Sequence, residues 1–169
     1  MATTVRLSNT SRKRRAMATT TPITGLDVLR AASEGSVETP PAAALLGWKA
    51  LTLETGRVRV QYTARPEFGN PHGAIQGGFL AAMLDDAMGP ALFTTLPADH
   101  FAPTIEMKVN FIRSARPGPI IAEGSVVHKT SSIAFLEGKL TTADGELIAT
   151  ATATARIFAP GKNEHGHSG

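Results

Sequence analysis

The sequence predicts an α+β domain in which an antiparallel sheet wraps around one long buried helix. Strand patterns occur in six segments between residues 49 and 158. One segment in the middle of the chain, residues 77–93, has a helical pattern that is apolar almost all round, as in a helix enclosed by protein. Helices and strands do not alternate as βαβ units, so the strands are expected to pair antiparallel.

Length and composition fit one globular domain. The 169 residues are 42% hydrophobic and 18% charged, and no apolar run approaches the roughly 20 residues needed to span a bilayer. The formal charge of +3 arises from five cations in the first sixteen residues, and the rest of the chain has 12 basic and 14 acidic side chains. This balance argues against a nucleic-acid-binding surface.

Residues 1–23 are expected to be a disordered N-terminal extension. Residues 1–16 are rich in Ser, Thr and Arg, a composition that would also suit a mitochondrial transit peptide. Because Met17 could be a second translation start, a disordered extension or an upstream start codon is the preferred interpretation. The chain has no cysteine, which excludes disulfides, thiolate catalysis and Cys-ligated metal sites. The absence of cysteine is compatible with a cytoplasmic location.

Residues 24–48 are interpreted as an accessory helix and a linker. Thr24 can cap a helix that runs through Ala32 and ends at Gly35. The Pro/Ala stretch at residues 39–44 indicates the linker.

Residues 49–158 form the predicted main domain. The segment begins with a hairpin whose turn is Thr55-Gly56, and residues 65–73 carry turn-forming residues throughout. Pro90 predicts a kink or an end near the last turns of the helix. Four strands follow, the last two joined by Asp144-Gly145. Residues 159–169 are expected to be a flexible tail, in which solvent exposure is a simpler account of the histidines than metal binding.

Asp85 interrupts the apolar helix on a face that it shares with small residues, namely Gly78, Ala81, Ala82 and Gly89. A buried, unpaired carboxylate is unfavourable, so it requires a partner, water or a function. Asp86 points about 100° further round the helix. Taken alone, the pattern fits a close contact between helices somewhat better than catalysis.

The segment just before this helix offers groups that suit catalysis. Gly77 and Gly78 let a ligand approach the backbone, and the free amides of the first turn favour developing negative charge, as an oxyanion hole requires. Asn70 and Gln76 add amide side chains, and His72 adds an imidazole. Each of these residues alone is equally typical of an ordinary turn.

The spacing of these residues resembles that of the PaaI-type (phenylacetic-acid-degradation) hotdog-fold acyl-CoA thioesterases. The family pattern begins with Asn, then five residues, then His-Gly-Gly. An acid stands nine residues after the His, and an Ala follows it. Residues 70–78 and 84–89 match this pattern, with Asn70 as the Asn and Asp85 as the acid. The similarity continues to about residue 158. One position departs from the pattern, because the family's His is Gln76 here, which can only hydrogen-bond. His72 stands four residues too early to replace it.

The resemblance implies hydrolysis of acyl-CoA by Asp85, acting as nucleophile or general base, with the Gly77 amide as oxyanion hole. Asn70 would place the nucleophile, water or carbonyl, and Gln76 would support the loop. The substrate-binding residues would be Gly78, His72, Lys129, Thr130 and Ser131, the last three in a turn similar to the family's coenzyme-contacting turn. Arg113 and Arg116 are weaker candidates for the phosphates. The family also implies a homodimer or homotetramer with shared active sites, no metal, and no cofactor beyond the coenzyme A of the substrate.

Two alternatives remain open. A hotdog protein that binds acyl-CoA without hydrolysing it is compatible with Gln76. A hydratase or dehydratase would carry a longer Asp and His signature, which the sequence lacks. Hydrolysis needs no strong general acid, because a thiol with a pKa near about 8.5 leaves readily. The sequence does not predict the acyl group.

Overall fold

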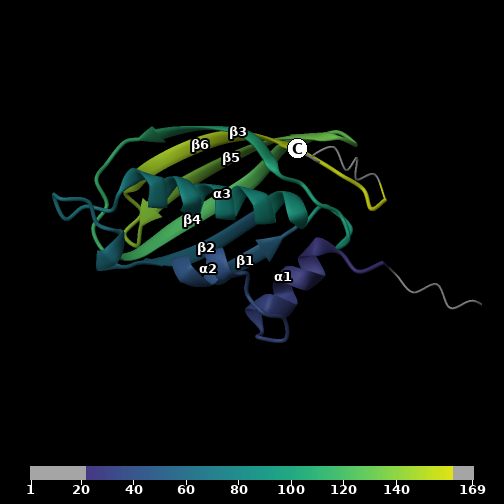
Figure 1. Ribbon diagram of the computed structural model, residues 1–169, viewed down its shortest axis with the longest axis horizontal. Coiled ribbons are helices and arrows are strands. Elements are labelled where there is room, and N and C mark those ends of the chain that lie inside the picture. Colours follow the sequence, from purple (N-terminus) through teal and green to yellow (C-terminus); the bar gives the residue numbers. More distant parts are fainter. Residues whose placement is uncertain (1–21, 162–169) are drawn as a thin grey trace, which may run out of the picture.

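The structure is a computed structural model that describes residues 22–161, so the expectations for residues 1–21 and 162–169 lie outside the described part. A six-stranded antiparallel sheet curves around one 17-residue helix, α3 (Gly77–Phe93) (Figure 1). The strand order is β1-β2-β4-β5-β6-β3. The predicted fold class, an antiparallel sheet around a single long helix, is confirmed.

The elements follow the predicted order. The strands are β1 (Lys49–Glu54), β2 (Arg57–Ala64), β3 (Thr104–Phe111), β4 (Gly118–Lys129), β5 (Ile133–Thr142) and β6 (Leu147–Arg156). The shorter helices are α1 (Gly25–Ser33), α2 (Pro41–Leu46) and the single 3-10 turn η1 (Pro66–Phe68). Helix α3 ends within one turn of Pro90, as predicted.

The two short helices precede the sheet. Thr24 caps α1 as predicted: its hydroxyl accepts from the Asp27 amide, and the Asp27 carboxylate accepts from the Thr24 amide in return. The linker expected at residues 39–44 is largely wrong, because residues 41–46 form α2. Proline is preorganised for the first helical position, alanine favours helix, and Gly47 ends α2 in the left-handed conformation (φ 73°).

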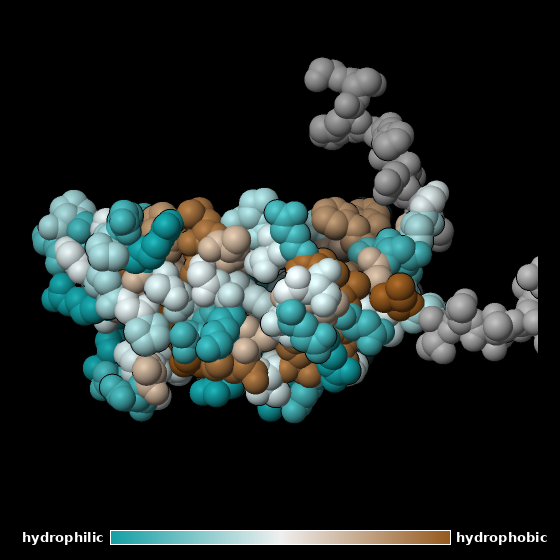
Figure 2. Space-filling view, turned by 90° about the horizontal axis from the view of Figure 1, so that it is seen from below, coloured by the Kyte–Doolittle hydropathy of each residue, from teal (hydrophilic) through white to brown (hydrophobic). Residues whose placement is uncertain are grey.

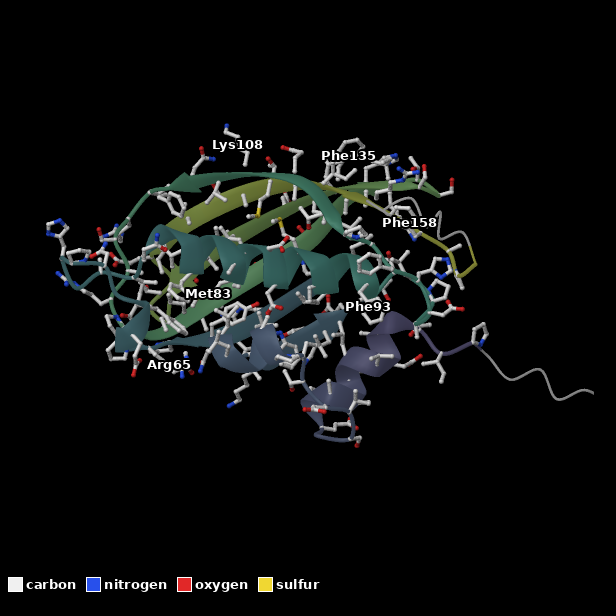
Figure 3. All side chains as sticks on the ribbon, in the orientation of Figure 1. Arg65, Met83, Phe93, Lys108, Phe135 and Phe158 are labelled. Carbon is white, nitrogen blue, oxygen red and sulfur yellow. The ribbon has the colours of Figure 1, made fainter. Side chains whose placement is uncertain are left out.

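Helix α3 lies directly on the concave face of the sheet and supplies much of the core. Seven of its side chains are buried there: Leu80, Met83, Leu84, Ala87, Met88, Ala91 and Leu92 (Met83 is labelled in Figure 3). A Cβ atom on Gly124 of β4 would collide with the backbone carbonyl of Ala87, so this glycine allows the helix to approach the sheet. None of the helices within residues 22–161 is long and apolar enough to cross a bilayer.

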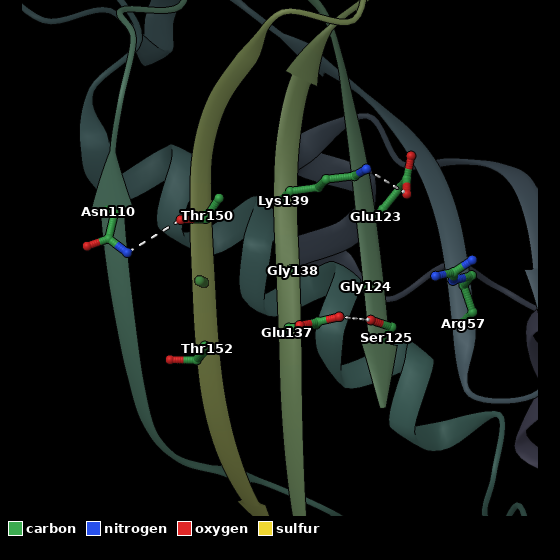
Figure 4. A pocket seen from close by; sticks show the side chains of 11 residues that line it. Arg57, Asn110, Glu123, Gly124, Ser125, Glu137, Gly138, Lys139, Thr150 and Thr152 are labelled. Carbon is green, nitrogen blue, oxygen red and sulfur yellow. Dashed lines mark hydrogen bonds and ion pairs between the residues drawn. The ribbon is translucent and has the colours of Figure 1, made fainter. Parts of the chain in front are cut away.

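The convex face of the sheet is polar. Lys108 and Phe135 point away from α3 on this side (Figure 3). Glu123 bridges Arg59 and Lys139 across three strands, at 3.5 and 3.2 Å. A shallow hollow of about 350 Å³ lies between two rows of such side chains (Figure 4). It faces away from α3, and antiparallel sheets commonly present one solvated face of this kind.

The two edges of the sheet differ. The β1 edge lies against α1. The face of the molecule seen in Figure 2 shows hydrophobic areas that are broken up by hydrophilic ones. The outer edge of β3 pairs with no other strand within the described residues. In and just after β3 the side chains of Ile105, Phe111 and Ile112 are 56–57% exposed. An open edge with apolar side chains is a surface that another chain can cover.

Candidate active site

Asp85 lies on the side of α3 that faces away from the sheet. The expectation of a buried carboxylate is wrong for the single chain: Asp85 is exposed together with Gly78 and Ala82, while Ala81 and Gly89 are half-buried. The physical reason is that the sheet covers only one side of the helix. The predicted stripe of small residues around Asp85 is therefore a solvent-facing surface of the isolated chain.

One hydrogen bond orients the Asp85 side chain. The hydroxyl of Thr104, at the start of β3, donates to Asp85 Oδ1 at 2.8 Å. A hydroxyl that donates to a carboxylate oxygen limits the rotation of that carboxylate. Thr104 is not among the residues predicted from the sequence, because only the tertiary fold brings the start of β3 beside the middle of α3.

Asp86 occupies a different environment from Asp85. Its Oδ2 accepts a hydrogen bond of 2.8 Å from the hydroxyl of Tyr62, a side chain of β2 that is fully buried. Burial raises the pKa of Asp86 to about 6, although the Tyr62 hydrogen bond acts in the opposite direction and the charge of Asp85 adds to the rise. Burial, together with the negative charge of Asp86, also raises the pKa of Tyr62 well above its ordinary value.

The start of α3 has one amide available for a ligand. Gln76 is the N-cap residue, and its Oε1 accepts from the Gly78 amide at 2.7 Å. The Gly78 amide is therefore occupied, whereas the Gly77 amide has no acceptor among residues 22–161. A Cβ atom on Gly77 would lie 3.1 Å from the ring of Phe111. Gln76 thus acts as a cap, and Gly77 is the better placed of the two glycines to bind an oxyanion.

Asn70 folds the loop before α3. Its Oδ1 accepts from the amides of His72 (2.9 Å) and Ala74 (3.2 Å). The side-chain oxygen is thereby used within the loop, and the NH₂ group remains to donate to a ligand. Asn70 and Gly77 both line a pocket of about 370 Å³, whose walls include Leu80 and Phe111.

His72 and Arg116 have structural roles in this loop. The His72 side chain is exposed, and only its backbone contacts the groups described above. Arg116 Nη1 donates to the carbonyl oxygens of His72 and Gly73, at 3.4 and 3.2 Å. Arg113 lines the pocket and forms an exposed ion pair with Glu146 at 3.3 Å.

The predicted coenzyme-contacting turn lies beyond the opposite end of α3. Lys129 Nζ donates to the backbone oxygen of Thr95 at 3.0 Å. The Thr130 hydroxyl accepts from the amides of Ser132 and Ile133 and so stabilises the turn itself. Ser131 is exposed. Within residues 22–161 no three His, Asp or Glu side chains are grouped so that they could hold a metal ion.

One chain does not bring Asp85 and Gly77 together. They are eight residues apart on the same helix, which corresponds to about 12 Å along its axis. Thr104 and Asp85 meet in the middle of α3, and Asn70 and Gly77 meet at its start. A carboxylate and an oxyanion hole that act on one carbonyl must lie much closer than this.

The chain is similar to known proteins over most of its described length. The family model described as Thioesterase superfamily matches residues 72–149. A predicted esterase from Saccharolobus solfataricus is 34% identical over 103 residues, which are 61% of this chain and 73% of that protein.

Solved structures show the same similarity. A predicted thioesterase from Ralstonia eutropha, described as phenylacetic acid degradation-related, superposes on this chain with a TM-score of 0.71 at 30% sequence identity. The superposition covers 75% of this chain and 97% of the Ralstonia chain. A Streptococcus mutans protein bound to acetyl-CoA shares the fold with a TM-score of 0.62 at 21% identity, over 66% of this chain and 89% of its own.

Proposed function

The chain belongs to the thioesterase superfamily and has its hotdog fold, and from this membership we propose that it hydrolyses acyl-CoA thioesters to a free acid and coenzyme A. The observation that carries the proposal is the exposed Asp85 carboxylate, held by Thr104, on the same face of α3 as Gly78. The family motif selects the same acid. The acetyl-CoA bound to the S. mutans protein, which shares the fold, supports an acyl-CoA as the kind of substrate.

The active site is completed by a second copy of the chain. Positions 78 and 85 are equidistant from the midpoint between Ala81 and Ala82. A twofold axis through that midpoint, relating two antiparallel α3 helices, would place the start of one helix beside Asp85 of the other. Alanines at the crossing point permit a short distance between the helices.

The open edge of β3 supports the same dimer. Thr104 of β3 bonds to Asp85 of α3, so the strand edge and the helix stripe lie next to each other. Pairing of β3 with its symmetry mate would satisfy the open edge and cover Ile105 and Phe111, which are more than half exposed in the single chain. The homodimer is then the smallest unit that contains a whole site, and a homotetramer would contain two such dimers.

The proposed reaction follows from this geometry. Asp85 attacks the thioester carbon, or removes a proton from a water molecule that does so. The carbonyl oxygen becomes negative and is stabilised by the Gly77 amide of the other copy. The C–S bond then breaks, and the sulfur leaves as a thiolate. If Asp85 is the nucleophile, its acyl anhydride is then hydrolysed by a water molecule, whose hydroxyl goes to the acyl carbon and whose proton goes to the thiolate, so that the acid and the Asp85 carboxylate are released. If Asp85 is the base, the proton that it took from the attacking water passes to the thiolate. The Oδ1 of Asn70 already accepts from two loop amides, so its NH₂ group is what remains to donate to the carbonyl oxygen or the attacking water. Gln76 holds the helix start and moves no proton.

The substrate would extend in two directions from the reacting carbon. The pocket beside Gly77 has a mixed lining, and its apolar part, which includes Leu80, Phe111 and Ile112, suits an acyl group. The turn at Lys129, Thr130 and Ser131 is the proposed contact for coenzyme A. Lys129 donates one hydrogen bond to Thr95 and its ammonium keeps further donors for a phosphate, while Ser131 offers an exposed hydroxyl.

A panel assay tests the proposed function. The release of free thiol is measured for aryl- and alkyl-CoAs of graded length with the wild type, Asp85→Asn, and Asp144→Asn as a control in an exposed hairpin turn. Asp85→Asn should reduce kcat by about 100-fold or more, and Asp144→Asn should not change it. An Asp85→Asn variant that retains most of its kcat would refute the role of this carboxylate.

The second candidate is an acyl-CoA-binding protein without hydrolase activity. Gln76 favours this binding function, because it replaces the family's ionisable His and its side chain caps α3. Calorimetric titration with the same acyl-CoAs distinguishes the two functions. Tight binding by the wild type without thiol release would establish the binding protein, whereas turnover establishes the enzyme.

A further inference from the structure

The proposed reaction leaves one ionisable pair, formed by the half-buried Asp86 and the buried Tyr62, unexplained. Asp86 follows Asp85 directly on α3, yet its carboxylate turns to the flank of the helix and accepts the hydroxyl hydrogen of Tyr62 at 2.8 Å. Tyr62 is fully buried, and the structure gives its hydroxyl no other partner within residues 22–161. A phenylalanine would fill the same space without requiring an acid beside its ring, so packing alone does not account for the pair.

Few other charges act on Asp86. The carboxylate of Asp85 and the hydroxyl of Tyr62 are the ionisable groups that shift its pKa. On the strands packed on α3, Arg59, Glu123 and Lys139 form ion pairs with one another on the convex face. Lys129 donates to the carbonyl oxygen of Thr95, beyond the end of α3. Glu106 and Thr154 pair with each other on β3 and β6. Asp27 and Arg30 of α1 are exposed. Asp85 is therefore the acid most directly affected by the charge of Asp86.

We propose that Asp86, held by Tyr62, is a positioning and tuning residue for Asp85: its negative charge promotes attack by the neighbouring carboxylate on the thioester. This inference rests on the proposed function. During attack, negative charge leaves Asp85 and develops on the thioester oxygen at the Gly77 amide. A fixed negative charge beside Asp85 repels the charge that departs and so favours the transition state over the ground state.

The same geometry gives the pair a dependence on pH. Asp86 is charged above a pH of about 6, because burial raises its pKa to that value, and it is neutral below. The promoting charge is therefore present at neutral pH and lost in mild acid. The Tyr62 hydrogen bond stabilises the charged form, so its removal should shift the transition to higher pH.

The test is the pH profile of kcat for thiol release by the wild type, Asp86→Asn and Tyr62→Phe. Asparagine still accepts a hydrogen bond from Tyr62 but carries no charge. The wild type should show a rise in kcat near pH 6. In Asp86→Asn this rise should be absent, and kcat at pH 8 should be lower by about tenfold. In Tyr62→Phe the rise should remain and move to higher pH.

A structural role alone predicts a different result. If the pair served only to hold α3 in place, both variants would lose stability while the rise near pH 6 stayed where it is. That outcome, or a Tyr62→Phe profile shifted to lower pH, would overturn the inference. Thermal melts identify a variant that fails to fold, in which case the other variant decides. An Asp85→Asn variant that retains most of its kcat would instead refute the role of Asp85, and the absence of thiol release by the wild type would overturn the proposed function itself, so these failures are distinguishable from a failure of the inference.

Discussion

Two adjacent acids of α3 show how strongly the surroundings determine what a residue does. Asp85 is exposed and accepts from Thr104, whereas Asp86 is half-buried and accepts from Tyr62. The helical period separates them by about 100°, which is enough to place one on the outer stripe and the other against β2. The resemblance to the family motif predicts that Asp85 is the catalytic acid. The residue whose pKa is raised is its neighbour Asp86.

Asp86 should make stability depend on pH. Its pKa is about 6 in the folded chain and close to 4 in the unfolded chain, so folding favours the protonated form. This contribution is fully present below about pH 4 and is lost as the pH rises through 6, and it amounts to about 2–3 kcal/mol. Urea unfolding at several pH values should show the decline in the wild type. In Asp86→Asn the slope over this range should be smaller, and equal slopes would contradict the assignment.

Thr104 should affect turnover more than binding. Thr104→Val removes the hydrogen bond to Asp85 at nearly constant shape, and kcat should fall by about tenfold or more with little change in KM. Thr104→Ser keeps the hydroxyl and should restore most of the rate. Thr152→Val on the convex face is the matched control. The role of Thr104 would be untenable if the valine variant turned over as fast as the serine variant.

The strands and the long helix could be predicted because each has a strong pattern. Alternation of Val58, Val60 and Tyr62 with charged or polar residues identifies a strand with one buried face, and all three side chains are fully buried. Helix α2 was missed because proline marks the start of a helix as well as a linker. Gln76 was not predicted as a cap, since glutamine is not among the preferred capping residues.

The contact between α3 and the sheet depends on one glycine. Gly124→Ala would place a methyl group against the backbone of Ala87, which cannot move without the helix, and should cost about 1–3 kcal/mol of stability or more. Its cross-strand neighbour Gly138 is the control, because alanine there would meet the flexible side chain of Met88. Urea unfolding should rank Gly124→Ala as clearly the less stable variant. Equal losses would mean that the helix adjusts easily.

At the scale of the whole molecule, the sequence could not show how the site is assembled. Thr104 and Tyr62 are distant in sequence from the acids they contact, so only the tertiary fold reveals these partners. The separation of Asp85 from Gly77, by contrast, follows from helix geometry alone. For the proposed site, this separation means that Asp85 and Gly77 can act on one carbonyl only if they come from two copies of the chain.

The dimer should depend on the edge of β3. Ile105 is 57% exposed in the single chain, and Ile105→Lys would place a charge in the proposed interface. Size-exclusion chromatography with light scattering should show a smaller species and reduced activity for this variant. Val127→Lys, at a position that is 61% exposed on β4, should leave the assembly unchanged. A dimer that tolerates Ile105→Lys would place the interface elsewhere.

Complementation between two inactive variants tests the shared site most directly. Asp85→Asn lacks the carboxylate, and Asn70→Ala lacks a group on the loop that leads to Gly77. In a mixed dimer, Asp85 from one chain and Asn70 from the other form one intact site, while the second site carries both changes. Thiol release should therefore be low for each variant alone and return when the two are unfolded together and refolded as a mixture. If the refolded mixture is no more active than the separate variants, Asp85 and the Gly77 loop do not act across a dimer.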